Sequence, residues 1–174
     1  MAVTDNAPMA HKQARPDTTP RGNLSEAQLK SVIGYQMAQA SVATSRIYDA
    51  AVGRKTGLHR LEYTILMLVR ENTGCTASSL AKALDISTPN MALWLDRVTG
   101  KGLVDRVPSA TDRRSNHLRL TPHGEQIVVG ATLAILKTEE AMLSRLSFGE
   151  RVLLAELLHK VAGCRDTIDA AEPD

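Results

Sequence analysis

Apolar positions along the chain recur mainly at helical spacing. Between residues 25 and 51 they alternate four and three apart, which places one side chain per turn on a single face of a long helix. This stripe consists of Leu29, Ile33, Ala40, Ala43 and Ile47, with the polar Gln36 at one of its positions. Ser25 and Gln28 have the spacing of a capping box, and Gly53 and Gly57 are expected to end the helix.

A second helix is predicted over residues 58–71, and two short helices separated by a turn follow it. In the 58–71 helix the shared apolar face carries Leu61, Ile65 and Leu68. Thr76 is the expected cap of the first short helix, whose inward residues are Leu80, Ala83 and Leu84.

Ser87 is the expected cap of the second short helix, where Pro89 fits because N–H groups in a first turn have no intrahelical partner. The buried side of that helix is expected to be Met91, Leu95 and Val98. Gly102 supplies a left-handed stop.

Alternating apolar residues then predict a two-stranded hairpin, formed by residues 103–107 and 117–121. The connection between them, Pro108–Asn116, is nine residues long. Hairpin loops usually take about 2–5 residues, and longer ones tend to carry function. This connection contains Asp112, Arg113 and Arg114 in a row.

Two more helices are predicted to close the chain. Thr121 caps the first, and Ser147 with Glu150 has capping-box spacing at the start of the second. The apolar face of the last helix consists of Leu153, Leu154, Leu157, Leu158, Val161, Cys164 and Ile168. A small central domain cannot cover both this helix and the first one, so we expect them to pack against a second copy of the chain.

Composition agrees with a small helical protein. The chain has 174 residues, 43% of them apolar but only 3% aromatic, so the core must be built from aliphatic side chains. The overall charge is only +2, but residues 101–119 carry a net +3 and residues 139–174 a net −4. Such polarity suits a protein that offers one surface to a polyanion.

Several classes of protein are disfavoured by what the sequence lacks. Two cysteines, Cys75 and Cys164, are too few and too far apart for a disulfide framework, and no signal peptide or membrane span is evident. We therefore expect a cytoplasmic protein with no membrane partner. The histidines lack ligand spacing, and no nucleophile elbow or phosphate loop is present, so we expect no enzyme, no metal and no cofactor.

The order helix, short helix, turn, short helix, hairpin is the winged helix-turn-helix arrangement, which suits duplex DNA. Over these elements the sequence resembles the MarR family of bacterial transcription regulators. The matching motifs are Leu80-Ala81, Leu95-Asp96-Arg97, Gly102-Leu103-Val104, Asp112-Arg113-Arg114-Ser115, Leu120-Thr121 and Gly124. The likeness covers about residues 25–170. The expected fold class is mainly α with a small β-hairpin wing, flanked by N- and C-terminal dimerisation helices.

This resemblance implies how the chain meets DNA. Residues 87–100 would lie in a major groove, and Asp112 in the wing would orient Arg114 toward a minor groove, with Arg113 on phosphate. Family members often carry a polar or arginine side chain where this chain has Leu93. The predicted DNA-binding residues are Ser87, Thr88, Asn90, Ala92, Leu93, Arg97, Asp112, Arg113 and Arg114.

The hydrogen-bonding groups and apolar atoms of some of these side chains indicate which base each would contact. Asn90 is expected to pair with adenine, and Ala92 or Leu93 to meet thymine methyl groups. The only tryptophan, Trp94, has two open roles, structural packing or contact with DNA.

The resulting prediction is a homodimeric, sequence-specific repressor. It binds a pseudo-palindromic operator and is released by a small anionic aromatic or lipophilic effector. Two alternatives stay open: a redox-sensing regulator acting through Cys75 or Cys164, and a winged-helix module without operator specificity. The expected divisions are 1–23, a disordered tail; 24–57, an N-terminal dimerisation helix; 58–121, the DNA-binding domain; and 122–174, C-terminal dimerisation helices. Side chains that could line an effector pocket are Tyr35, Tyr48, Tyr63, Arg46 and Arg60.

Overall fold

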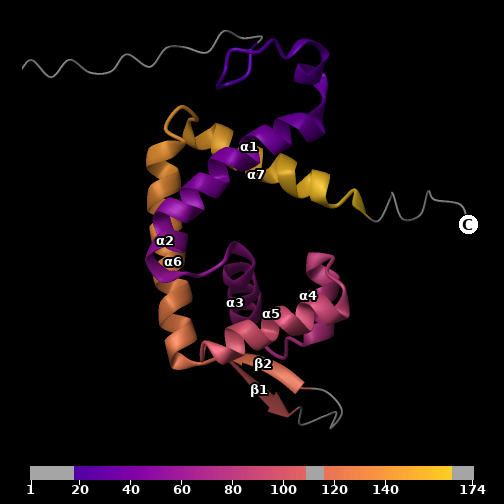
Figure 1. Ribbon diagram of the computed structural model, residues 1–174, viewed down its shortest axis with the longest axis vertical. Helices are drawn as coiled ribbons and strands as arrows, with labels where there is room; N and C mark the ends of the chain where they lie inside the picture. Colours follow the sequence, from indigo (N-terminus) through magenta and orange to yellow (C-terminus); the bar gives the residue numbers. More distant parts are fainter. Residues whose placement is uncertain (1–17, 109–115, 166–174) are drawn as a thin grey trace, which may run out of the picture. The chain divides into compact units, whose positions relative to one another are not determined.

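The computed structural model describes residues 18–108 and 116–165. Its contacts divide the chain into two compact units, of which the first ends at Thr44 and the second begins at Ser45. The described residues form helices and one two-stranded antiparallel sheet, so the predicted class, mainly α with a small β-hairpin, is confirmed (Figure 1). None of the described helices is long and apolar enough to cross a membrane.

The first unit contains a turn, a 3-10 helix and most of a long α-helix. Thr18 and Ser25 form an antiparallel bridge, after which η1 (Ala27–Ser31) and α1 (Ile33–Tyr48) follow. The single helix predicted over 25–51 is therefore wrong: the β-branched Val32 between them is extended, with φ −86° and ψ 107°.

The capping box predicted at Ser25 is also wrong. Because the backbone of Ser25 is engaged in the bridge to Thr18, Glu26 takes the N-cap position and its side chain makes no capping hydrogen bond. The Glu26 carboxylate instead accepts a hydrogen bond of 2.9 Å from the hydroxyl of Tyr35.

After α1 the helical path continues further than the sequence predicts. A π-helical turn, η2 (Asp49–Gly53), leads into the short α2 (Arg54–Thr56). Gly53 keeps right-handed helical angles and does not end the helix, whereas Gly57, with φ 67°, does. The hydroxyl of Tyr48 donates a hydrogen bond of 3.0 Å to the carbonyl of Leu58 and fixes the chain after this turn.

Three helices form the centre of the second unit: α3 (Arg60–Glu71), α4 (Ala77–Leu84) and α5 (Thr88–Gly100). Thr76 caps α4 as predicted, in a capping box with Ser79. Ser87 occupies the predicted N-cap position of α5, but its side chain makes no capping hydrogen bond.

The core packs against one face of each helix. Met91, Leu95 and Val98 of α5 are buried, as predicted. On α3 the predicted face is shifted, because the buried residues are Glu62, Ile65, Leu66 and Val69, while Leu61 and Leu68 are half-buried. On α4 the buried residues are Leu80 and Ala81, and Ala83 is exposed.

The hairpin consists of β1 (Val104–Pro108) and β2 (Asn116–Leu120), with Arg106 opposite Leu118. Both strands extend one residue into the predicted loop, and its remaining residues, 109–115, lie outside the described part of the chain. The other edge of β2 is held by a hydrogen bond of 2.8 Å from the Leu118 N–H to the Cys75 carbonyl. The base of the wing is thus anchored to the residues before α4.

Two helices follow the hairpin, α6 (Pro122–Met142) and α7 (Phe148–Ala162). The predicted caps are confirmed: the hydroxyl of Thr121 accepts a hydrogen bond from the Gly124 N–H, and Ser147 forms a capping box with Glu150. Gly124, Val128 and Ala131 are the buried residues of α6. No residue of α7 is buried, and Ile168, expected on its face, lies outside the described residues.

Candidate nucleic-acid interface

The exposed surface of α5 and its N-cap carries the residues of this segment that the sequence predicts to bind DNA. Its opposite side is held in the core by the buried Met91, Leu95 and Val98. Leu93 has 64% of its surface exposed. The exposed predicted residues on this side are Ser87, Thr88, Asn90, Ala92, Leu93 and Arg97. The structure therefore brings these six together on a helix surface that can enter a major groove.

Trp94 connects this surface to the start of α3. Its ring stacks on the imidazole of His59, with centroids 4.8 Å apart and an interplanar angle of 28°. The guanidinium of Arg97 lies 4.8 Å from the centroid of the same indole. A guanidinium over an aromatic face loses part of its rotational freedom, so Arg97 is partly oriented before any ligand arrives. Packing is therefore the role of Trp94 that these contacts favour.

A buried carboxylate holds the other end of α5. Oε2 of Glu62 lies 2.6 Å from Nζ of Lys101, and only 2% of the Glu62 side chain is exposed. The same oxygen accepts a hydrogen bond of 2.8 Å from the His59 N–H. Burial acts to raise the pKa of Glu62, but these hydrogen bonds and the charges of Lys101 and Arg97 outweigh it and lower that pKa. Glu62 is therefore ionised at neutral pH, with its Oε2 bound to both Lys101 and the His59 N–H.

This ion pair is not predicted by the sequence. The available signal is the spacing of His59 and Glu62, which matches a capping box with histidine in place of the usual serine or threonine. In the structure Nδ1 of His59 accepts a hydrogen bond of 3.1 Å from the Leu61 N–H. Nothing in the local sequence names Lys101 as the partner of Glu62.

An exposed ion pair connects α5 to the wing. The carboxylate of Asp96 lies 2.5 Å from Nη2 of Arg106 on β1. Both side chains are substantially exposed, so the pair adds little stability, but it restrains the hairpin relative to the helix. The predicted wing residues Asp112, Arg113 and Arg114 lie between β1 and β2, outside the described residues.

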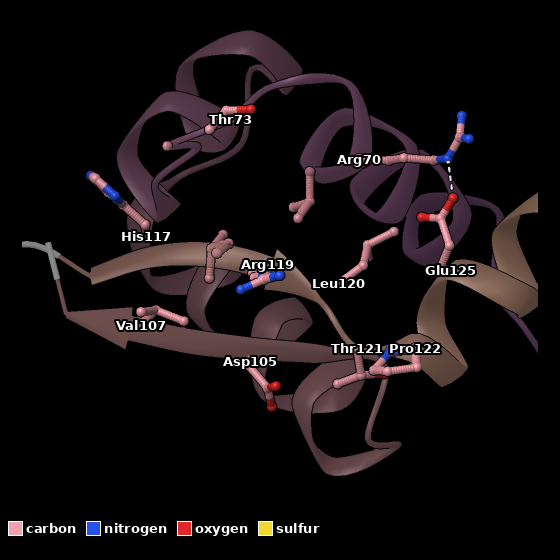
Figure 2. A pocket seen from close by; sticks show the side chains of 13 residues that line it. Arg70, Thr73, Asp105, Val107, His117, Arg119, Leu120, Thr121, Pro122 and Glu125 are labelled. Atoms are coloured by element: carbon pink, nitrogen blue, oxygen red, sulfur yellow. Dashed lines mark hydrogen bonds and ion pairs between the residues drawn. The ribbon is translucent and has the colours of Figure 1, made fainter.

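A hollow of about 810 Å³ lies between the end of α3, the hairpin and the start of α6 (Figure 2). Its rim mixes Arg70 and Arg119 with Asp105 and Glu125, so it lacks the uniform positive charge that attracts a phosphate backbone. Arg70 and Glu125 form an ion pair of 2.8 Å at one edge of it, drawn as a dashed line in Figure 2. This pair ties the far end of α3 to α6.

The possible effector residues are only partly brought together. The rings of Tyr48 and Tyr63 lie 5.9 Å apart, and Tyr63 shares a hydrogen bond of 3.0 Å with Thr132. Tyr48 and Arg60 also line a cavity of about 430 Å³, which reaches Arg97 of α5 and Lys101 directly after it. Neither Arg46 nor Tyr63 lines it, and Tyr35 belongs to the other unit.

The two cysteines lie in different surroundings. Cys75 is buried, with its Sγ 3.6 Å from Oγ of Ser79, whereas Cys164 is exposed. Among the described residues, no three histidine, cysteine, aspartate or glutamate side chains gather as metal ligands would.

Comparison with known proteins identifies relatives of the same architecture. Residues 58–115 match the MarR family. The chain is 26% identical over 153 residues to a Thauera aromatica protein provisionally named a transcriptional regulatory protein for the hcr operon, a match that spans 88% of this chain and 92% of that protein.

Solved structures extend the comparison. The transcriptional repressor CouR, bound to a 23-mer DNA duplex, is 28% identical, with a TM-score of 0.73 over 80% of this chain and 98% of CouR. PcaV of Streptomyces coelicolor, in complex with its natural ligand, shares the fold at 21% identity, with a TM-score of 0.67 over 86% of this chain and 98% of PcaV.

Proposed function

We propose that this chain, which belongs to the MarR family of DNA-binding transcriptional regulators, acts as a homodimeric repressor that a small molecule releases from its operator. The observation that carries the proposal is the exposed side of α5, with Asn90, Leu93 and Arg97 pointing away from a buried apolar face. Its DNA-bound relative CouR is itself a repressor.

Each subunit would place α5 in a major groove and Asp112–Arg114 against a neighbouring minor groove. In this arrangement Asn90 pairs with adenine, Ala92 and Leu93 contact thymine methyl groups, and Ser87 and Thr88 lie at the phosphate backbone. Arg97 adds a cation at the same surface. Two-fold symmetry then requires a pseudo-palindromic operator with half-sites about one helical turn, ~10 bp, apart.

The exposed apolar residues of α7 support the dimer. Large apolar side chains are exposed along its whole length, which a monomeric soluble protein rarely tolerates. They are Phe148, Val152, Leu153, Leu154, Leu157, Leu158 and Val161. A second copy of the chain would cover them, and an isologous pairing gives the two-fold axis that a palindromic operator needs.

The cavity of about 430 Å³ supports an anionic effector. It is lined by four cations, Arg54, Arg60, Arg97 and Lys101, against two acids, Asp49 and Glu62. Because Glu62 is already paired with Lys101, the lining has an excess of positive charge for a carboxylate or phenolate. The effector would reach α5 directly through Arg97. PcaV, of the same fold, is known in complex with its natural ligand.

Fluorescence anisotropy tests the repressor assignment. A labelled duplex from upstream of the gene that encodes the chain is compared with a shuffled duplex across a salt series, and sedimentation measures the mass of the free protein. We expect a dimer that prefers the native duplex by about 10³-fold or more, with a steep salt dependence. Equal affinities for the native, the shuffled and selected random duplexes would refute the proposal.

The same measurement decides the second candidate function, a winged-helix module without operator specificity. The exposed Leu93 favours that candidate, because a leucine on the recognition surface forms no hydrogen bond to a base edge. This candidate function predicts that the ratio of the affinities for the native and the shuffled duplex is near one.

A further inference from the structure

Trp94 and Arg97 of α5 and Lys101, which follows the helix directly, are spaced three and four apart. Opposite them stand His59 and Glu62, the cap and the first turn of α3. The His59–Trp94 stack and the Trp94–Arg97 contact join three of these side chains, and the Glu62–Lys101 ion pair joins the other two. The backbone N–H of His59, which donates a hydrogen bond to Glu62, links the two groups. We call these five residues the α3–α5 clamp.

We propose that the α3–α5 clamp sets the orientation of the recognition helix, with Glu62 and Lys101 as positioning residues and Arg97 as the side chain that they present to DNA. This inference rests on the proposed function, in which α5 enters the major groove. Glu62 is too deeply buried to touch DNA, so any effect that it has on operator binding acts through α5.

Lys101 also connects the clamp to the chain that precedes α3. Its Nζ lies 3.4 Å from the carbonyl oxygen of Gly57, the left-handed residue at which α2 ends. Leu58, the next residue, accepts the hydrogen bond from Tyr48. A single ammonium group therefore joins the end of α5, the start of α3 and the turn after α2. A shift of that turn would pull on Lys101 and move the helix.

Charge and positioning predict opposite changes in operator affinity when Glu62 is replaced by glutamine. Glu62→Gln removes a negative charge close to a surface that binds a polyanion, and it frees the charge of Lys101. Charge alone therefore predicts tighter binding to every duplex. Loss of positioning predicts weaker binding to the operator only, because contacts to base edges require an oriented helix, whereas non-specific binding depends on phosphate.

The experiment compares full-length wild type with Glu62→Gln, Lys101→Met and a matched control, Glu125→Gln. The control breaks the ion pair between Glu125 of α6 and Arg70, which lies at the opposite end of α3 from Glu62. Glutamine at position 62 keeps an oxygen for the His59 N–H, so α3 retains its cap, and circular dichroism checks that each variant is folded.

At ~0.15 M salt we expect Glu62→Gln and Lys101→Met to weaken operator binding about tenfold, comparable to the loss of one good base contact. Affinity for shuffled DNA should stay within about twofold of wild type. Glu125→Gln should change neither affinity. Unchanged or tighter operator binding by Glu62→Gln overturns the proposal. For Lys101, equal weakening on both duplexes with a salt slope lower by about one would show a phosphate contact and overturn its positioning role.

A DNA-free measurement separates this proposal from the repressor assignment. Trp94 is the only tryptophan, so acrylamide quenching of its fluorescence reports on the clamp directly. We expect faster quenching in Glu62→Gln and Lys101→Met and wild-type quenching in Glu125→Gln. If wild type shows no operator preference, the proposed function fails, and quenching alone still decides the clamp. Wild-type quenching in both clamp variants would refute it whatever the DNA result.

Discussion

Gly124, in the first turn of α6, lies directly against the backbone of Leu103. A Cβ atom on residue 124 would stand 2.1 Å from the Leu103 carbonyl oxygen, far inside van der Waals contact. That oxygen also accepts a hydrogen bond of 3.1 Å from the Thr121 N–H, and the Thr121 hydroxyl donates one of 2.7 Å to the Gly102 carbonyl. The start of α6 is thus joined to the segment between α5 and β1.

Because backbone atoms surround this contact, Gly124→Ala must move α6 or the wing. We expect the free energy of unfolding to fall by about 2–3 kcal/mol, measured by urea denaturation. Gly130→Ala on the same helix is the control, since a Cβ there meets nothing within 4 Å. That change should be neutral or stabilise by up to ~1 kcal/mol, because alanine favours the helix. Equal stabilities of the two variants would contradict the close approach.

Tyr48 predicts a loss of stability in alkali. Burial, followed by the charges nearby, raises the pKa of its phenol from 10.0 to about 12. The unfolded chain therefore releases this proton first, so the stabilising effect is complete below pH ~10 and is lost between about pH 10 and 12. Absorbance at 295 nm should reveal a tyrosine of pKa about 12 that is missing from Tyr48→Phe.

The same variant provides the stability control. At pH 7 Tyr48→Phe should cost ~1 kcal/mol, the worth of the hydrogen bond to Leu58. Between pH 10 and 12 its free energy of unfolding should fall less than that of wild type. Parallel loss in both proteins would mean that Tyr48 titrates like an ordinary tyrosine.

Arg114 is predicted to contact DNA from the wing. Arg114→Ala should weaken operator binding by about 1–3 kcal/mol at ~0.15 M salt, while sedimentation still shows an intact dimer. Arg145→Ala removes the same charge from an exposed site between α6 and α7 and should leave the affinity unchanged. Wild-type affinity in Arg114→Ala would remove the wing from the DNA-binding surface.

Peroxide should have little effect on operator binding. Cys75 is buried beside Ser79, and a thiol shielded in this way reacts slowly. Anisotropy measured before and after peroxide treatment should agree for wild type, Cys75→Ser and Cys164→Ser. A loss of binding in wild type that either variant escapes would instead favour the redox-sensing alternative.

Short-range rules predicted much of the structure from the sequence. The buried face of α5, the caps at Thr76, Thr121 and Ser147 and the left-handed Gly102 all depend on residues within one or two helical turns. The rule failed at Ser25, because Thr18 engages the same backbone in a bridge. It also failed at Gly53, because a glycine permits a left-handed angle without requiring one.

By itself, then, the sequence determined the helices from α3 onward, the hairpin and the side of α5 that faces outward, because periodicity and capping are local properties. Only the tertiary structure decided which distant residues meet. Glu62 and Lys101 are 39 positions apart, and Arg70 and Glu125 are 55 apart. Each pair forms because packed helices bring the two side chains together, and the angle between packed helices depends on every contact in the core. The angle between two packed helices therefore cannot be predicted from the residue pattern of one segment.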